Sequence, residues 1–362
     1  MSVTRLRVIL DVNTRLGGVK EKQVKEVKVA AVAPAAFREE EEYRNAAQAV
    51  SYLEEAVRSG AQLIVFPEGY PGPCNGPMDS GSKLAVTPIE MMQDAARKHG
   101  VYISCGNMEE TNIQADTYYL CHKIIFPSGE IMANYKRCQP TPPALNAYLY
   151  YGRKHLVPGD GPMVIDTDIG KLGLIICSEI KVPELARVEM LMGAQVLLDP
   201  VGGTHGREKV LRQVGHGNLA PRAKMNIWKS LAQARATENM MYVVTTANIW
   251  ETESMWGSCI ATPEGLIAEG EGAGIIYGTL DLDRLTYLRS RCWQEYDFED
   301  PPSSDLPVTD PGEHRDRRPE LYQMLVEPQA DAFNFFYYED GVETWREFDK
   351  QRVAQPPRLP RA

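Results

Sequence analysis

The stretch that decides the fold is Gly173-Leu-Ile-Ile-Cys-Ser-Glu-Ile-Lys-Val-Pro-Glu184. A short apolar run that starts at Gly173 and leads into Cys177 is typical of a strand buried on both faces. Pro183 suits the first turn of a helix, where its missing N–H leaves no hydrogen bond unmade, and Glu184 complements the positive helix end. The stretch therefore predicts a central strand, a sharp turn and a helix, with Cys177 at the end of the strand.

Cys177 has two interpretations at this point. A thiol at a strand end, beside the main-chain N–H groups of a turn, is a candidate nucleophile. A free cysteine more often serves as a small buried apolar residue. The stretch alone is compatible with both.

The composition restricts the class of protein. Charged residues make up 24% and apolar residues 43% of the 362 residues, which is typical of a soluble globular chain. The net charge of −10 and the lack of a Lys/Arg cluster argue against nucleic-acid binding. Seven cysteines without CxxC or Cys/His spacing indicate neither a disulfide framework nor a zinc site. No apolar stretch approaches the roughly 18 residues of a membrane span, and residues 1–26 lack the apolar core of a secretory signal, so we expect a cytoplasmic protein.

Strands and helices alternate on both sides of the central stretch. Turn signals at Pro127-Ser-Gly129 and Asp168-Ile-Gly170 predict two hairpins, the second of which includes the Cys177 strand. Alternation with some hairpins predicts an α/β fold with a mixed sheet, or two sheets, covered by helices. The predicted strands lie at 27–32, 63–66, 101–105, 118–126, 130–135, 163–166, 173–177, 195–198, 242–247, 258–261, 266–269 and 274–280, and the predicted helices at 46–57, 89–98, 183–192 and 226–239.

The chain changes character after Arg291. Prolines interrupt a polar stretch between 301 and 311, and Phe333 to Tyr338 concentrates aromatic side chains. So many adjacent aromatic residues would form an apolar patch that monomers rarely expose. We therefore predict an N-terminal extension (1–26), a folded domain (27–290) and a tail (291–362) that packs on the domain or on a partner subunit.

Three strand ends present reactive side chains. Glu68 follows a buried strand, where a carboxylate is costly unless it is paired or used. Lys136 and Arg137 end a hairpin strand, and Cys177 ends the central strand. Each also has a plain structural explanation: a helix cap or ion-pair partner for Glu68, and a solvated strand end for Lys136.

A carboxylate, a cation and a thiol together can perform acyl transfer. Glu68 would take the thiol proton and later activate water, and the thiolate would attack a carbonyl or nitrile carbon. The cation and the main-chain N–H of Ser178, the amide after the nucleophile, would stabilise the tetrahedral oxyanion.

The order and context of these segments resemble the nitrilase superfamily of carbon–nitrogen hydrolases. The resemblance implies a four-layer α-β-β-α sandwich, usually assembled into homodimers or larger oligomers. It also implies a Glu–Lys–Cys triad, no metal and no organic cofactor. The matching segments are 63–68, 129–137, 157–160, 173–177 with Pro183-Glu184, 235–239 and 257–265, so the resemblance covers about residues 27–290.

Two positions depart from the family pattern. The catalytic Lys usually lies two residues after the Tyr of this segment, where the present chain has Arg137, and Lys136 lies one residue early. A second Glu of many members corresponds, without gaps, to Gly152. We assign catalytic roles to Glu68, Lys136 and Cys177, with Arg137 as the alternative cation because adjacent strand residues face opposite sides.

Substrate-binding roles are assigned to Arg137, Ser178 and Tyr70. The loops 70–75 and 141–154 would set the choice of substrate. The resemblance implies hydrolysis of a non-peptide carbon–nitrogen bond in a small carboxamide or N-carbamoyl compound, through a Cys thioester. Nitrile-cleaving members often have Trp after the nucleophile, so Ser178 favours an amide. A nitrilase, or a catalytically impaired member that acts as a binding or assembly subunit, is the alternative.

Overall fold

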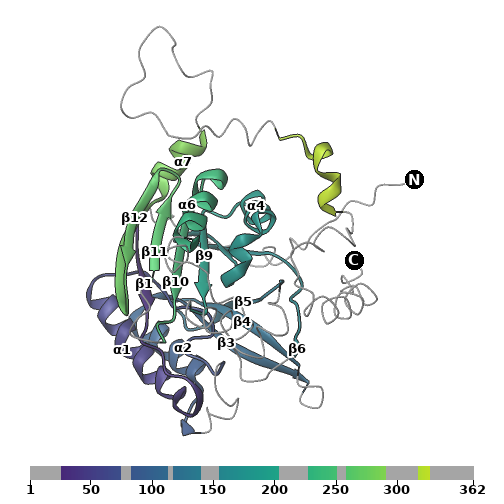
Figure 1. Cartoon of the computed structure of the whole chain (residues 1–362). Helices are drawn as coiled ribbons and strands as arrows, with labels where there is room; N and C mark the ends of the chain where they lie inside the picture. Colours follow the sequence, from purple (N-terminus) through teal and green to yellow (C-terminus); the bar gives the residue numbers. More distant parts are fainter. Residues whose placement is uncertain are drawn as a thin grey trace, which may run out of the picture. The chain divides into compact units, whose positions relative to one another are not determined.

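The structure of the protein is a computed structural model (Figure 1). It describes residues 26–74, 83–112, 117–139, 155–203, 227–250, 258–290 and 317–326. The chain divides into two compact units. The larger, Val24–Asp316, contains both sheets, and the described part of the other contains the short 3-10 helix η6 (Pro319–Val326).

The first sheet has the strand order β13-β1-β2-β3-β4-β5, with β6 beside β4. The strands β1, β2 and β3 are parallel. Strand β13 is antiparallel to β1, and β4 is antiparallel to β3 and β5 but parallel to β6. The bounds are β1 (Glu26–Ala33), β2 (Leu63–Val65), β3 (Tyr102–Asn112), β4 (Thr117–Ile125), β5 (Ile131–Lys136), β6 (His155–Leu156) and β13 (Gly274–Asp281).

The second sheet has the order β12-β11-β10-β9-β8-β7. Its centre is the parallel set β8, β9 and β10, and antiparallel strands lie on both sides of it. The bounds are β7 (Met163–Thr167), β8 (Gly170–Leu174), β9 (Val196–Val201), β10 (Tyr242–Ala247), β11 (Ser258–Thr262) and β12 (Gly265–Gly270).

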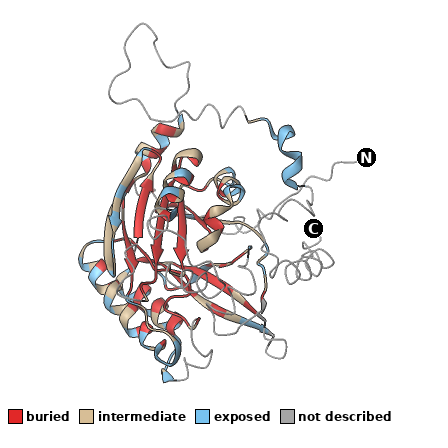
Figure 2. Cartoon of the chain, viewed as in Figure 1, coloured by how far each residue is buried: buried red, intermediate tan, exposed pale blue. Residues whose placement is uncertain are grey.

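The two sheets pack face to face and helices cover their outer faces. An apolar core between the sheets includes Val29 of β1 and Leu174 of β8. A second core lies between the first sheet and the helices α1 (Arg44–Arg58) and α2 (Pro88–His99). A third lies between the second sheet and α4 (Pro183–Leu191) and α6 (Ile227–Asn239). Figure 2 shows the buried strands in red between these helices. The predicted four-layer α-β-β-α sandwich is confirmed.

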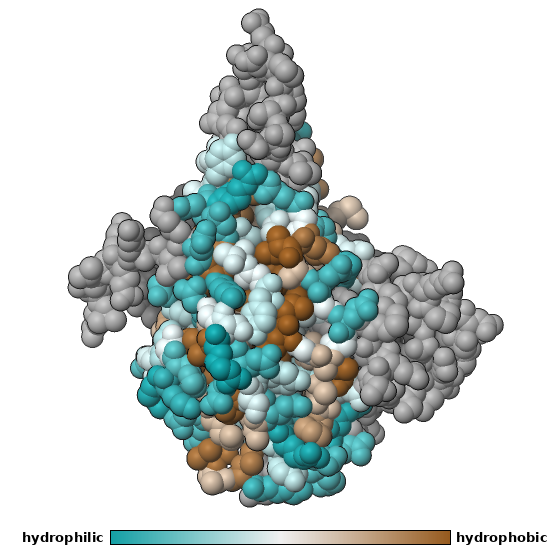
Figure 3. Space-filling view, turned by 90° about the vertical axis from the view of Figure 1, so that its left-hand side faces the viewer, coloured by the Kyte–Doolittle hydropathy of each residue, from teal (hydrophilic) through white to brown (hydrophobic). Residues whose placement is uncertain are grey.

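Local sequence signals explain the ends of the helices. Thr87 and Glu90 form a reciprocal capping box at the start of α2, and Gly100 ends that helix in the left-handed conformation. In α1 the buried residues Ala46, Ala49 and Leu53 recur at helical spacing. Hydrophilic side chains cover much of the side of the molecule that carries α1 and β12, with apolar patches between them (Figure 3).

Some elements differ from the sequence prediction. Strand β3 continues to Asn112 instead of ending at Cys105, because its whole length pairs with β4. Strand β8 ends at Leu174, although the N–H of Ile175 still donates to Leu198 O at 3.0 Å. The helix α7 (Leu282–Ser290) was not predicted. The aromatic stretch 333–338 lies outside the described residues. None of the helices in the described part of the chain is long and apolar enough to span a membrane.

Glu189 is a carboxylic acid inside the layer between α4 and β8. It is fully buried, and its Oε1 accepts a long hydrogen bond from Met163 N at 3.4 Å. Its Oε2 contacts Gly173 so closely that a side chain there would collide with it. Burial raises the pKa of Glu189 well above 4.5, and the nearby Glu179 carboxyl adds to the rise. The folded protein therefore keeps a proton on Glu189 that the unfolded chain releases as the pH rises above about 4.5.

We predict that Glu189→Gln stabilises the protein at pH 8. Because the folded-state pKa is raised, stability falls as the pH rises from the unfolded value toward the folded one, and a neutral amide removes this loss. The expected gain in the free energy of unfolding is about 1–3 kcal/mol at pH 8 and less at pH 5. Urea denaturation at both pH values measures it. Glu184→Gln, at an exposed position of the same helix, is the control. Equal pH dependence of wild type and Glu189→Gln would contradict the prediction.

Candidate active site

Cys177 lies where the chain turns sharply out of the second sheet. The extended backbone continues through Ile175 and Ile176, and Cys177 then opens the 3-10 helix η3 (Cys177–Lys181). Its φ of 55° is in the left-handed region, which residues other than glycine adopt only when the surrounding structure enforces it. The residue as a whole is partly exposed, whereas its sulfur is buried. The thiol is therefore presented at the carboxyl end of a central parallel strand.

Glu68 reaches the same region from the first sheet. It follows β2 by three residues and is 3% exposed. Asn248, directly after β10, donates from Nδ2 to the main-chain oxygen of Glu68 at 2.9 Å and to that of Gly202 at 3.5 Å. A Cβ on Gly202 would lie 2.8 Å from Glu68 Oε2. Gly202 is therefore required for the close approach of the Glu68 carboxylate to the end of β9.

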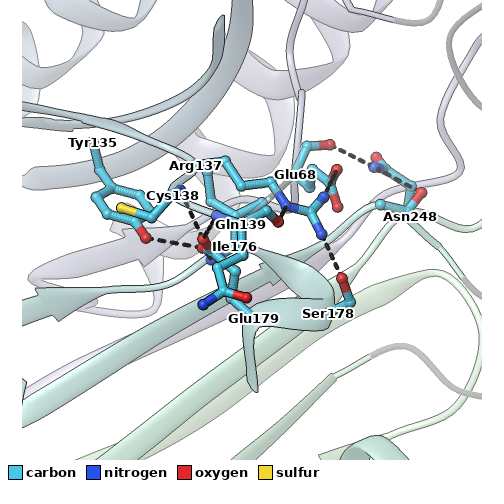
Figure 4. A network of polar contacts seen from close by, with 10 residues as sticks. Glu68, Tyr135, Arg137, Cys138, Gln139, Ile176, Ser178, Glu179 and Asn248 are labelled. Carbon is cyan, nitrogen blue, oxygen red and sulfur yellow. Dashed lines mark hydrogen bonds and ion pairs between the residues drawn. The ribbon is translucent and has the colours of Figure 1, made fainter. Parts of the chain in front are cut away.

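Arg137 joins Glu68 to the turn that follows Cys177 (Figure 4). Its Nη1 donates to Glu68 Oε1 at 3.5 Å, and the two side chains are 1% and 2% exposed. Its Nη2 donates to Ser178 Oγ, and its Nε donates to Gln139 O at 2.9 Å. The guanidinium thus contacts the carboxylate from one sheet and the residue after the nucleophile on the other.

Lys136 and Tyr70 lie apart from this set of contacts. Lys136 Nζ is 4.2 Å from the ring centroid of Tyr119, on the side of β5 opposite to Arg137, as the alternation of strand residues requires. Tyr70 is 1% exposed and belongs to the core beneath α1 and α2, where its hydroxyl donates to Gln48 at 3.0 Å. The structure therefore brings together Glu68, Arg137, Cys177 and Ser178 of the residues assigned from sequence. Gly152 and loop 141–154 lie outside the described residues.

The electrostatic surroundings of Cys177 favour the neutral thiol. Burial raises its pKa, and the Glu68 carboxylate raises it further. The Arg137 guanidinium and the main-chain N–H of Gly202 oppose the rise. Since only the thiolate is strongly nucleophilic, the proton has to leave as the sulfur attacks, and a base is needed at that moment.

Glu179 is a residue of this site that the sequence analysis did not identify. It is 1% exposed and accepts hydrogen bonds from the N–H groups of Cys138 (2.7 Å), Gln139 (2.8 Å) and Ile176 (2.7 Å). The hydroxyl of Tyr135 donates to it at 2.9 Å. A carboxylate two residues after Cys177, beside the apolar Ile180, was the available sequence signal.

No group of three or more His, Cys, Asp and Glu side chains within the described part of the chain could hold a metal ion. A carboxylate, a guanidinium and a thiol that interact electrostatically can perform nucleophilic acyl chemistry.

The chain is similar to known carbon-nitrogen hydrolases and amidases. The family model described as carbon-nitrogen hydrolase matches residues 28–290. The chain is 27% identical over 306 residues to deaminated glutathione amidase of Bos taurus, covering 76% of this chain and 78% of that protein. It is 24% identical over 256 residues to omega-amidase of Homo sapiens, covering 68% and 86%.

A solved structure shows the same fold. The carbon-nitrogen hydrolase of Helicobacter pylori G27 superposes with a TM-score of 0.64 at 20% identity, covering 84% of this chain and 99% of that one. The family model spans most of the chain, including every residue of the site described above. The protein therefore belongs to the carbon–nitrogen hydrolases, the enzymes of the nitrilase superfamily.

Proposed function

We propose that the protein hydrolyses the amide bond of a small carboxamide or N-carbamoyl compound, with Cys177 as nucleophile. The observation that carries the proposal is the buried contact of Arg137 with both Glu68 and Ser178, beside the Cys177 thiol. The names of the amidases to which the chain is similar support an amide as substrate.

The first half of the reaction forms a thioester. Glu68 accepts the proton of Cys177 as the sulfur attacks the carbonyl carbon, and the carbonyl electron pair moves onto oxygen. The Arg137 guanidinium and the N–H of Ser178 stabilise this oxyanion. Glu68 then gives the proton to the nitrogen as the C–N bond breaks, so that the amine leaves neutral.

The second half restores the enzyme. Glu68 takes a proton from a water molecule, whose oxygen attacks the thioester carbon. When the C–S bond breaks, the sulfur regains a proton and the carboxylic acid departs. Water is the only co-reactant, so the two half-reactions together convert the amide and one water molecule into the carboxylic acid and the amine.

In this proposal Arg137 takes the place that the sequence analysis gave to Lys136. A guanidinium stabilises an oxyanion well, but it does not give up a proton near neutral pH. All four proton transfers of the two half-reactions therefore fall to Glu68. This division differs from a site with Lys, whose ammonium group can exchange a proton with the departing amine.

Nitriles are the second candidate substrate, since the same thiol can attack a nitrile carbon. Ser178 in the position after the nucleophile and the amidase names of the relatives favour amides. Ammonia release from a panel of amides, nitriles and ureides tests the proposal. Release from none of them would favour the impaired binding or assembly subunit.

We also propose that the enzyme acts as a homo-oligomer in the cytoplasm, with the domain at 27–290 and the tail at 291–362. Apolar side chains are exposed on α4, at Val188 (41%) and Leu191 (53%), and on η6, at Met324 (69%) and Val326 (74%). Surfaces of this kind are commonly covered by another subunit. The net charge of −10 argues against nucleic acid as a partner.

Cys177→Ala is expected to abolish turnover of the best amide and leave the melting temperature nearly unchanged. The reason is that the sulfur is the only atom proposed to bond to the substrate, and Ala removes little buried volume at a partly exposed position. Steady-state assays and thermal melts measure the two effects. Mass spectrometry of trapped wild-type enzyme should place the acyl adduct on Cys177.

Cys138→Ala is the matched control, because Cys138 is also a partly exposed free cysteine near the site. It should keep turnover within a few-fold of wild type. An active Cys177→Ala protein, or an adduct on Cys138, would end the proposal of Cys177 as nucleophile.

Arg137→Ala is expected to lower kcat about 10²-fold or more, as the loss of an oxyanion donor does. Lys136→Ala should change kcat by less than about threefold, since Lys136 Nζ lies over the Tyr119 ring. The two substituted positions are neighbours in the chain, at the end of β5, so each variant serves as the other's control. A large loss in Lys136→Ala with an active Arg137→Ala would return the role to Lys136.

A further inference from the structure

A single carboxylate connects the two strand ends that carry Arg137 and Cys177. Oxygen Oε1 of Glu179 accepts hydrogen bonds from the N–H groups of Cys138 and Gln139, the two residues after Arg137. Oxygen Oε2 accepts from the N–H of Ile176, the residue before Cys177. Figure 4 shows Glu179 between these segments. The first segment follows β5 of the first sheet, and the second follows β8 of the other sheet.

The same connection controls the direction of the guanidinium. Gln139 donates its N–H to Glu179 and accepts the Nε of Arg137 on its carbonyl oxygen, at 2.9 Å. If Gln139 moves, the acceptor that orients Nε moves with it. The position of the Arg137 guanidinium relative to Cys177 therefore depends on two linked hydrogen bonds, from Gln139 N–H to Glu179 and from Arg137 Nε to Gln139 O.

The four contacts require a carboxylate. All of the partners act as donors, three of them main-chain N–H groups that cannot accept. Burial raises the pKa of Glu179, whereas Arg137 and the hydrogen bonds to the carboxylate oppose the rise. A glutamine would turn an NH2 group toward one of these pairs and leave at least one main-chain N–H without an acceptor from residue 179.

We propose that Glu179 is a positioning residue, which holds the Arg137 guanidinium in register with Cys177 and acts on the reaction only through Arg137. The proposal rests on the amidase function proposed above. A residue that merely stabilised the core would affect the melting temperature and leave the rate per folded molecule unchanged.

The test is a double-mutant cycle on kcat with the best amide of the panel, at a temperature well below the melting point of every variant. Glu179→Gln alone should lower kcat about 10²-fold, as the misplacement or loss of an oxyanion donor does, with KM changed by less than about threefold. In an Arg137→Ala background, Glu179→Gln should lower kcat by less than about threefold, because the guanidinium that Glu179 positions is already absent.

Two further variants make the comparison sharp. Glu179→Asp keeps the charge but is one methylene shorter, so it cannot reach both strand ends, and we expect it to lower kcat less than Glu179→Gln does. If Glu179→Gln does not fold, Glu179→Asp replaces it in the double-mutant cycle with Arg137→Ala. Glu184→Gln, at an exposed position on α4, should match wild type.

The outcomes are distinct. A wild-type kcat in folded Glu179→Gln, or an equal loss with and without Arg137, would overturn the positioning role while the amidase function stands. Wild-type enzyme that hydrolyses no member of the panel would instead overturn the proposed function itself.

Discussion

The ion pair between Arg137 and Glu68 is the interaction on which the site depends. Both side chains are almost fully buried, at 1% and 2% exposure, so both have lost the hydration that normally stabilises their charges. Desolvation of two such groups costs several kcal/mol each, and the pair is tolerated only when further hydrogen bonds complete it. Ser178 and Gln139 do this for Arg137, and Asn248 anchors the main chain of Glu68.

The sandwich explains how these groups meet. Glu68 and Cys177 follow β2 and β8, which belong to different sheets, and Arg137 follows the hairpin strand β5. Strand ends are held by the ladders behind them, so the side chains that follow have little freedom to move apart. Gly202 completes the arrangement, because any side chain there would occupy the space of the Glu68 carboxylate.

Two other buried carboxyl groups show that burial alone does not define a role. Glu179 accepts four hydrogen bonds and connects the segments that carry Arg137 and Cys177. Glu189 accepts a long hydrogen bond from Met163 N, and its second oxygen has no partner within hydrogen-bond geometry among the described residues. The first arrangement suits an ionised group and the second a protonated one. Buried carboxyls of the second kind lower stability as the pH rises, whereas Glu179 holds the geometry on which the proposed chemistry depends.

The sequence by itself determined the layers of the fold and three of the strand ends that carry the site. The apolar runs before Glu68 and Cys177, the hairpin turn at Pro127-Ser-Gly129 and the helix signals around Thr87 and Gly100 are local patterns, and local patterns specify local elements. Only the tertiary structure placed Arg137 rather than Lys136 beside Glu68 and placed Tyr70 in the core under α1 and α2. It alone also brought Glu179 and Asn248 to these strand ends. The physical reason is that a strand alternates its side chains between two faces, but the face that meets Glu68 depends on the packing of one sheet against the other. Hydrogen bonds between segments tens of residues apart, such as that from Cys138 to Glu179, leave no periodic trace in the chain.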